Sequence, residues 1–183
     1  MSALSAQKGW ALRRDEWENY LRLHGHAEAV NAFMRLPHER IDGVTYWRLM
    51  AGFVWWRTEN FTERWLWRGL LQRHPEHRAA MMSDAEQGKL ASLPEQVEVW
   101  RGVSDAEYAE GFSWTLSRRQ AHWFAKRFAF EGTSPRLLRG SIARTDVIAF
   151  LDGRSEQEIV AFPESVEILS ESRLRTHSAM PRR

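Results

Sequence analysis

The chain has 183 residues, of which 43% are hydrophobic and 27% charged, and this composition excludes an intrinsically disordered protein. This length supports one well-buried core and leaves little room for two full domains. The formal net charge of +2 is too small to predict nucleic-acid binding, and the absence of cysteine excludes disulfides and thiolate chemistry.

The sequence has no pattern typical of a membrane or secreted protein. Its first 14 residues lack the apolar stretch of a signal peptide. The longest apolar run, residues 49–56, is far shorter than a bilayer-spanning helix and is flanked by Arg48 and Arg57. We therefore expect a soluble, cytoplasmic protein that makes no contact with a membrane.

The first half of the chain has the periodicity of amphipathic helices. Apolar side chains recur at spacings of three and four residues, with breaks at Pro37 and Asp42. The third helix is expected over residues 44–59 and the fourth over residues 62–73, while residues 1–9 are expected to fray.

Helix-start signals mark the last two helices of this half. Asn60 is placed to cap the fourth helix. Ser83 followed by Glu86 is typical of a capping box and predicts a last helix that ends before Pro94. Residues 1–94 are thus expected to form a helical part packed on the rest of the chain.

Ten tryptophans are an unusual number for this length, and five of them lie in the third and fourth predicted helices. They are Trp47, Trp55, Trp56, Trp65 and Trp67. They could form a binding surface, but their spacing is that of packed helices, so we predict that they belong to the core. His74 and His77 could bind a metal, but Pro75 separates them and no third ligand is nearby, so no metal site is expected.

After Pro94 the periodicity changes from helical to alternating. Six strands are expected, over residues 97–101, 112–116, 137–143, 147–151, 158–162 and 166–169. Ser117 can cap a helix after the second strand, with an apolar face made of Ala121, Phe124, Ala125 and Phe128. A run of helices followed by a run of strands predicts an α+β fold with a mostly antiparallel sheet. There is no G-x-G-x-x-G and no P-loop, so a Rossmann or NTPase fold is not expected.

Polar residues interrupt two of the predicted strands. Ser113 and Thr115 share one strand face, and Trp114 points to the other. Glu156 and Glu158 also share a face if their strand has begun by residue 156. Two neighbouring carboxylates repel each other, so a fold has reason to avoid them unless solvent or a cation compensates.

Three fragments in chain order resemble the R–S–E signature of mono-ADP-ribosyltransferases of the bacterial and phage type. They are Arg101-Gly102, then Ser113-Trp114-Thr115 followed by Ala121 and Phe124-Ala125, then Glu156-Gln157-Glu158. The resemblance covers about residues 96–170 and rests on the joint order of the fragments. One departure is Trp114, because the middle triplet of many family members is Ser-Thr-Ser.

The resemblance implies both a fold and an activity. The fold would be an ADP-ribosyltransferase-like, mostly antiparallel split β-sandwich in residues 95–183, preceded by the helical residues 1–94. The activity would be cleavage of the nicotinamide–ribose bond of NAD and transfer of ADP-ribose to a macromolecular acceptor. NAD would be a substrate, and the reaction would need no metal.

The catalytic roles follow from the same resemblance. Glu158, the second Glu of E-x-E, would stabilise the oxocarbenium-like ribose, and Ser113 would support Glu158 and the ribose by hydrogen bonding. Glu156 would orient an acceptor guanidinium and help to remove its proton, which favours arginine of a protein as the acceptor.

The NAD-binding roles complete the predicted site. Arg101 would pair with the pyrophosphate, and the backbone of Gly102 would approach the nicotinamide. Ser113, Trp114 and Thr115 would line the same NAD site, with the role of Thr115 less defined than that of Ser113.

Three alternatives remain open at this point. Within the same fold, the protein could be an NAD glycohydrolase toxin or an ADP-ribosyltransferase that modifies nucleic acid. Outside it, the protein could be a non-enzymatic, tryptophan-rich interaction module. The hypothesis that the protein is an enzyme implies a toxin or effector in the cytoplasm of a bacterium or a phage-infected host. Its partner would be an antitoxin or a host target.

Overall fold

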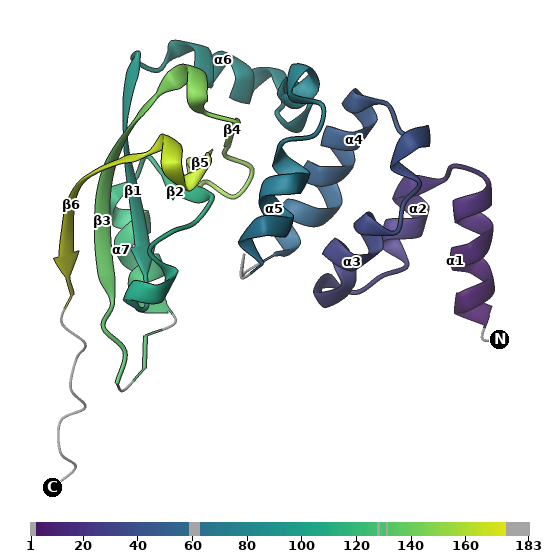
Figure 1. Cartoon of the computed structure of the whole chain (residues 1–183), viewed down its shortest axis with the longest axis horizontal. Coiled ribbons are helices and arrows are strands. Elements are labelled where there is room, and N and C mark those ends of the chain that lie inside the picture. Colours follow the sequence, from purple (N-terminus) through teal and green to yellow (C-terminus); the bar gives the residue numbers. More distant parts are fainter. Residues whose placement is uncertain (1–2, 59–62, 128, 131, 175–183) are drawn as a thin grey trace, which may run out of the picture. The chain divides into compact units, whose positions relative to one another are not determined.

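Helices fill the first half of the chain and strands dominate the second half. The computed structural model describes residues 3–58, 63–127, 129–130 and 132–174. The chain divides into two units, Met1–Ser83 and Asp84–Arg183. The division precedes the expected boundary at residue 94, because helix α6 (Asp84–Ser92) belongs with the sheet. The predicted α+β class is confirmed (Figure 1).

The helical unit consists of short helices joined by tight turns. They are α1 (Ala3–Arg13), α2 (Trp17–Arg22), α3 (Ala29–Met34), α4 (Gly43–Leu49) and α5 (Arg64–Leu71), with 3-10 turns at His26–Glu28, His38–Arg40 and Pro75–Met81. The expectation that residues 1–9 fray is wrong for the described part, because α1 already begins at Ala3. Asn60 and the expected start of the fourth helix at residue 62 lie outside the described residues.

The expected helix over residues 44–59 is one helical run with three hydrogen-bonding patterns. Asp42 caps α4, accepting hydrogen bonds from the Thr45 amide at 3.0 Å and the Thr45 hydroxyl at 2.7 Å. The run continues as a π-helical segment, Met50–Val54, and ends as a 3-10 turn, Trp55–Arg57. Apolar periodicity shows which face is buried and does not distinguish these patterns, so the sequence could not predict the change.

The core of the helical unit is aromatic. Phe33, Tyr46 and Trp47 are fully buried. The Tyr46 hydroxyl donates to the carbonyl of Leu70 and the Trp47 indole to the carbonyl of His74, both at 2.8 Å. These bonds satisfy the polar ends of both buried rings and connect α4 to the segment that begins with α5.

The tryptophan prediction is only partly confirmed. Trp47, Trp55 and Trp67 are buried, as expected for core residues. Trp56 and Trp65 are exposed, and the side chain of Trp65 keeps 73% of its surface accessible. A spacing rule finds the helix but cannot locate its solvent-facing side when both sides carry tryptophan.

The sheet unit confirms all six expected strands. They are β1 (Gln96–Val103), β2 (Ser113–Thr115), β3 (Arg136–Ala143), β4 (Ala149–Leu151), β5 (Glu158–Val160) and β6 (Glu167–Arg173), with 3-10 turns at Ala106–Tyr108, Arg144–Asp146 and Pro163–Ser165. Every described pairing is antiparallel, and the order is β4-β5-β2-β1-β3-β6. Hydrogen bonding thus joins the strands into one six-stranded sheet, whereas the resemblance implies a sheet split into two layers.

Helix α7 (Arg118–Arg127) covers one face of this sheet along β1 (Figure 1). Its buried residues, Ala121 and Ala125, belong to the face expected from the sequence, while Phe128 lies outside the described residues. The packing is close at Gly102, where an added Cβ would lie 1.6 Å from the carbonyl oxygen of Ala121. Two small alanines and a glycine therefore let the helix backbone lie directly on the strand.

Among the described helices, none is both long enough and apolar enough to cross a membrane.

Candidate active site

Strand register brings Ser113 and Glu158 together. Strands β2 and β5 are neighbours, and Thr115 is the register partner of Glu158. Register partners point to the same sheet face, and Ser113 shares that face because it lies two residues before Thr115. The Ser113 hydroxyl donates a hydrogen bond to Oε1 of Glu158. Both residues are partly exposed, so the pair lies at the surface of the sheet unit.

Cationic groups lie on the same sheet face. Trp100 is the register partner of Thr115, so its indole points to the side of Ser113 and Glu158. The guanidinium groups of Arg118 and Arg139 lie over this indole, 5.4 and 5.9 Å from the ring centroid. Arg139 also forms an ion pair with the carboxylate of Glu98, so its charge is balanced within the sheet.

Arg101 starts from the opposite face and turns toward the loop before β2. Its Nη1 donates to the carbonyl oxygen of Ser113 at 2.5 Å, and Nε and Nη2 donate to the carbonyl oxygen of Tyr108 at 3.4 and 3.1 Å. An added Cβ at Gly111 would lie 2.2 Å from Nη2, so this glycine gives the guanidinium its space. Arg101 thus fixes the backbone that carries Ser113. The pairing with pyrophosphate stays a prediction.

Gly102 and Trp114 have packing roles in the structure. The Cβ direction of Gly102 is occupied by α7, so the close approach that the glycine permits is that of the Ala121 carbonyl. Trp114 is 3% exposed, and its indole donates to the carbonyl of Gly111 at 3.1 Å. Because the Trp114 side chain is in the core on the other side of the strand, we assign it no contact with a ligand.

The Thr115 hydroxyl connects the turn that carries Glu156 to the start of α7. Its hydroxyl donates to the carbonyl oxygen of Glu156 at 2.6 Å and accepts from the amide of Ser117 at 3.0 Å. The Ser117 hydroxyl in turn accepts from the amide of Gln120 at 3.2 Å, which confirms the predicted helix cap. Thr115 is buried, so its role in the structure is to position residues around it.

Glu156 does not belong to β5, which begins at Glu158. Ser155 and Gln157 have positive φ angles of 57° and 48°, so the backbone around Glu156 is that of a turn. The condition for a shared strand face is therefore not met. The Glu156 carboxylate instead pairs with Arg154, with Nη2 and Oε2 2.9 Å apart.

Sequence reasoning missed three residues that shape this site. Arg154 forms an ion pair with Glu156, and its position two residues before that carboxylate was the available signal. Asp152 accepts a hydrogen bond from the Gln157 amide at 3.0 Å and so fixes the turn, and the Asp152-Gly153 pair was the available signal. Gly111 gave no signal, because its role depends on the conformation of Arg101.

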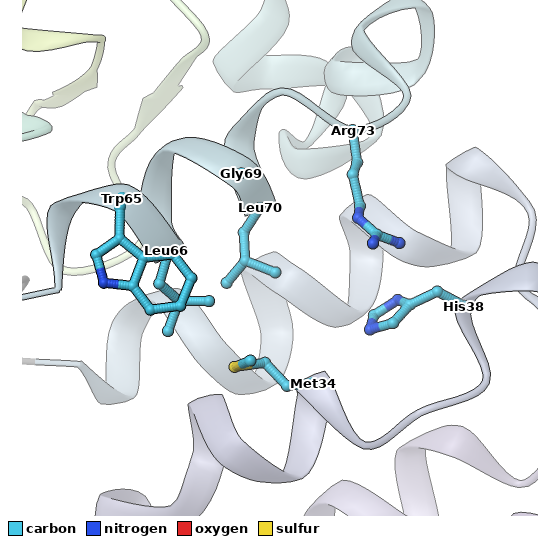
Figure 2. A pocket seen from close by; sticks show the side chains of 7 residues that line it. All are labelled: Met34, His38, Trp65, Leu66, Gly69, Leu70 and Arg73. Carbon is cyan, nitrogen blue, oxygen red and sulfur yellow. The ribbon is translucent and has the colours of Figure 1, made fainter.

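A groove in the helical unit is a second candidate site (Figure 2). It has a volume of about 200 Å³ and is lined by Met34, His38, Trp65, Leu66, Gly69, Leu70 and Arg73. Figure 2 shows Arg73 and His38 at one end and Trp65 at the other, with apolar side chains between them. The groove is open and contains no carboxylate, so it lacks a group that could stabilise a cationic transition state.

The imidazole of His38 in this groove should make stability depend on pH. Burial, and secondly the charge of Arg73, lower the pKa of His38 below its ordinary value of 6.5. The unfolded chain then binds a proton more readily, so the free energy of unfolding should fall as pH decreases below 6.5. Urea unfolding of the wild type and His38→Gln at pH about 7 and about 5 should show a smaller pH-dependent loss in the variant. Equal losses in both proteins would contradict the assignment.

Among the described residues, no group of three or more His, Asp or Glu is arranged to hold a metal ion. What the sheet unit offers chemically is a carboxylate oriented by a hydroxyl, and a second carboxylate on a turn that pairs with a guanidinium. Comparison of the chain with family models, curated proteins and solved structures found no match in any of the three.

Proposed function

We propose that this protein is a mono-ADP-ribosyltransferase that cleaves NAD at the nicotinamide–ribose bond and transfers ADP-ribose to an arginine side chain of a protein. The observation that carries the proposal is the hydrogen bond from Ser113 on β2 to Glu158 on β5. Two residues 45 positions apart, singled out by the R–S–E resemblance, meet across neighbouring strands.

The chemistry suits a carboxylate held in this manner. Nicotinamide leaves NAD from a pyridinium, so it takes the electron pair of the broken bond and needs no proton. The ribose becomes oxocarbenium-like, and a negative charge near it stabilises the transition state more than the ground state. Glu158 supplies that charge, and the Ser113 hydroxyl fixes its orientation before NAD binds.

The transfer step needs a second group at the acceptor. A guanidinium nitrogen forms the new bond to the ribose C1′, and one of its protons must leave as the bond forms. Glu156 is the base in this proposal, because a carboxylate can both orient a guanidinium and accept its proton. The products are nicotinamide, ADP-ribosylated arginine and one proton.

Arg101 acts mainly through the loop and the backbone of Ser113. Its contacts to Tyr108 and Ser113 make it a positioning residue, and its pairing with the pyrophosphate of NAD rests on the resemblance alone. Arg118 adds positive charge over Trp100, whereas the charge of Arg139 at the same ring is balanced by Glu98. The contact of the Gly102 backbone with nicotinamide rests on the resemblance alone, because the Ala121 carbonyl of α7 fills the space that the missing side chain leaves.

The decisive experiment measures nicotinamide release by the full chain. The protein is incubated with NAD, alone and with an arginine analogue such as agmatine, and nicotinamide and ADP-ribosylated agmatine are quantified by chromatography. Release of nicotinamide with transfer to agmatine is expected. If nicotinamide is not released under either condition, the enzyme proposal fails and the tryptophan-rich interaction module becomes the better account.

A further inference from the structure

The turn before β5 contains an ion pair between two of its own side chains. Nη2 of Arg154 lies 2.9 Å from Oε2 of Glu156. The Arg154 side chain keeps 55% of its surface exposed, whereas that of Glu156 keeps only 18%. The carboxylate is thus the fixed partner, and the arginine reaches over it from the solvent side.

Backbone contacts hold Glu156 in its place independently of Arg154. Thr115 donates to its carbonyl oxygen from β2, and the next residue, Gln157, donates its amide to Asp152. Ser155 and Gln157, on either side of Glu156, both have left-handed backbone conformations that non-glycine residues adopt only when the surroundings require them. The backbone position of Glu156 is therefore set by the fold, and removal of Arg154 should leave the residue on the same turn.

We propose that Arg154 occupies, within the same chain, the position that Glu156 offers to the guanidinium of the acceptor. This inference rests on the proposed function, in which Glu156 orients the acceptor arginine. The ion pair supports it directly, because the group bound to the Glu156 carboxylate is itself a guanidinium. An incoming arginine must displace Arg154 before it can be oriented for transfer, so Arg154 determines how well acceptors bind.

Loss of Arg154 should therefore change the binding of the acceptor and leave the binding of NAD unchanged. Exposed ion pairs contribute little free energy, so an acceptor can displace Arg154 at modest cost. When Arg154 is absent, the Glu156 carboxylate is available to the acceptor without competition. The KM for a guanidine acceptor should fall, whereas the KM for NAD does not depend on this competition.

The test compares Arg154→Gln with the wild type, using agmatine as acceptor and NAD as donor. The KM for agmatine should fall by about fivefold in Arg154→Gln, the size of effect expected for one exposed ion pair. Arg154→Lys keeps the positive charge and should restore most of the wild-type KM. Arg40→Gln removes an ion-paired arginine from the helical unit, where Asp15 is its partner, and should leave the KM for agmatine unchanged.

The outcomes separate this inference from the proposed function. If Arg154→Gln releases nicotinamide but binds agmatine no better than the wild type, Arg154 does not compete with the acceptor and the inference is overturned. A higher KM in this variant also overturns it, because Arg154 would then assist the acceptor. If the wild type releases no nicotinamide at all, the proposed function fails and the inference fails with it.

Discussion

Replacing Glu158 with Gln is expected to lower the rate of nicotinamide release by about two to three powers of ten. Glutamine keeps the shape of the side chain and an oxygen that can accept the hydrogen bond from Ser113. It removes the negative charge that, in the proposed mechanism, stabilises the oxocarbenium-like ribose. The loss should therefore appear in kcat more than in the KM for NAD, because the interaction is stronger in the transition state. Steady-state kinetics of nicotinamide release measure both constants.

A matched substitution shows whether the loss is specific to this carboxylate. Glu171 on β6 pairs with Arg136 at an exposed site on the same sheet, and Glu171→Gln removes the same charge from the same unit. Its rate of nicotinamide release should equal that of the wild type. If Glu158→Gln retains full activity while the wild type cleaves NAD, the site is assigned to the wrong residue.

The meeting of Ser113 and Glu158 could be predicted only in part from the sequence. Alternation along β2 predicts that Ser113 and Thr115 share a face, and the structure has Thr115 as register partner of Glu158. Which strand pairs with which is not contained in a local pattern, because the partners are 45 residues apart. The resemblance to a family supplied that long-range information, since its signature names the residues that meet.

The remaining site residues depend on loop conformation, which periodicity does not describe. The position of Glu156 follows from two left-handed residues beside it, Ser155 and Gln157, neither of which is a glycine. The direction of the Arg101 guanidinium follows from the carbonyl groups of the loop before β2. Sequence patterns predict the strands and the buried face of α7 here, because burial is periodic, but they place the exposed Trp56 and Trp65 in the core. Such patterns do not predict which backbone carbonyl accepts a hydrogen bond from a given side chain.

Gly102 is the residue whose substitution should affect stability most. In Gly102→Ala, the new Cβ would lie 1.6 Å from the Ala121 carbonyl oxygen and 2.7 Å from the Ala125 amide nitrogen. Both neighbours are backbone atoms of α7, so no side-chain rotation can relieve the overlap and the helix must move away from β1. Overpacking of this kind costs about 3 kcal/mol or more. We expect a lower urea midpoint and faster hydrogen exchange of the amides in β1.

Gly88 in α6 of the same unit provides the opposite case. Nothing lies within 4 Å of a Cβ added there, and the residue is inside a helix. Gly88→Ala should therefore raise the free energy of unfolding by about 0.5–1 kcal/mol, because alanine loses less backbone entropy in a helix. If the free energy of unfolding falls in Gly102→Ala and rises in Gly88→Ala, the loss at Gly102 comes from its contact with α7. Equal stability of Gly102→Ala and the wild type would mean that α7 does not lie against β1 at this position, and the sheet face that carries Glu158 would then be open where the structure has it covered.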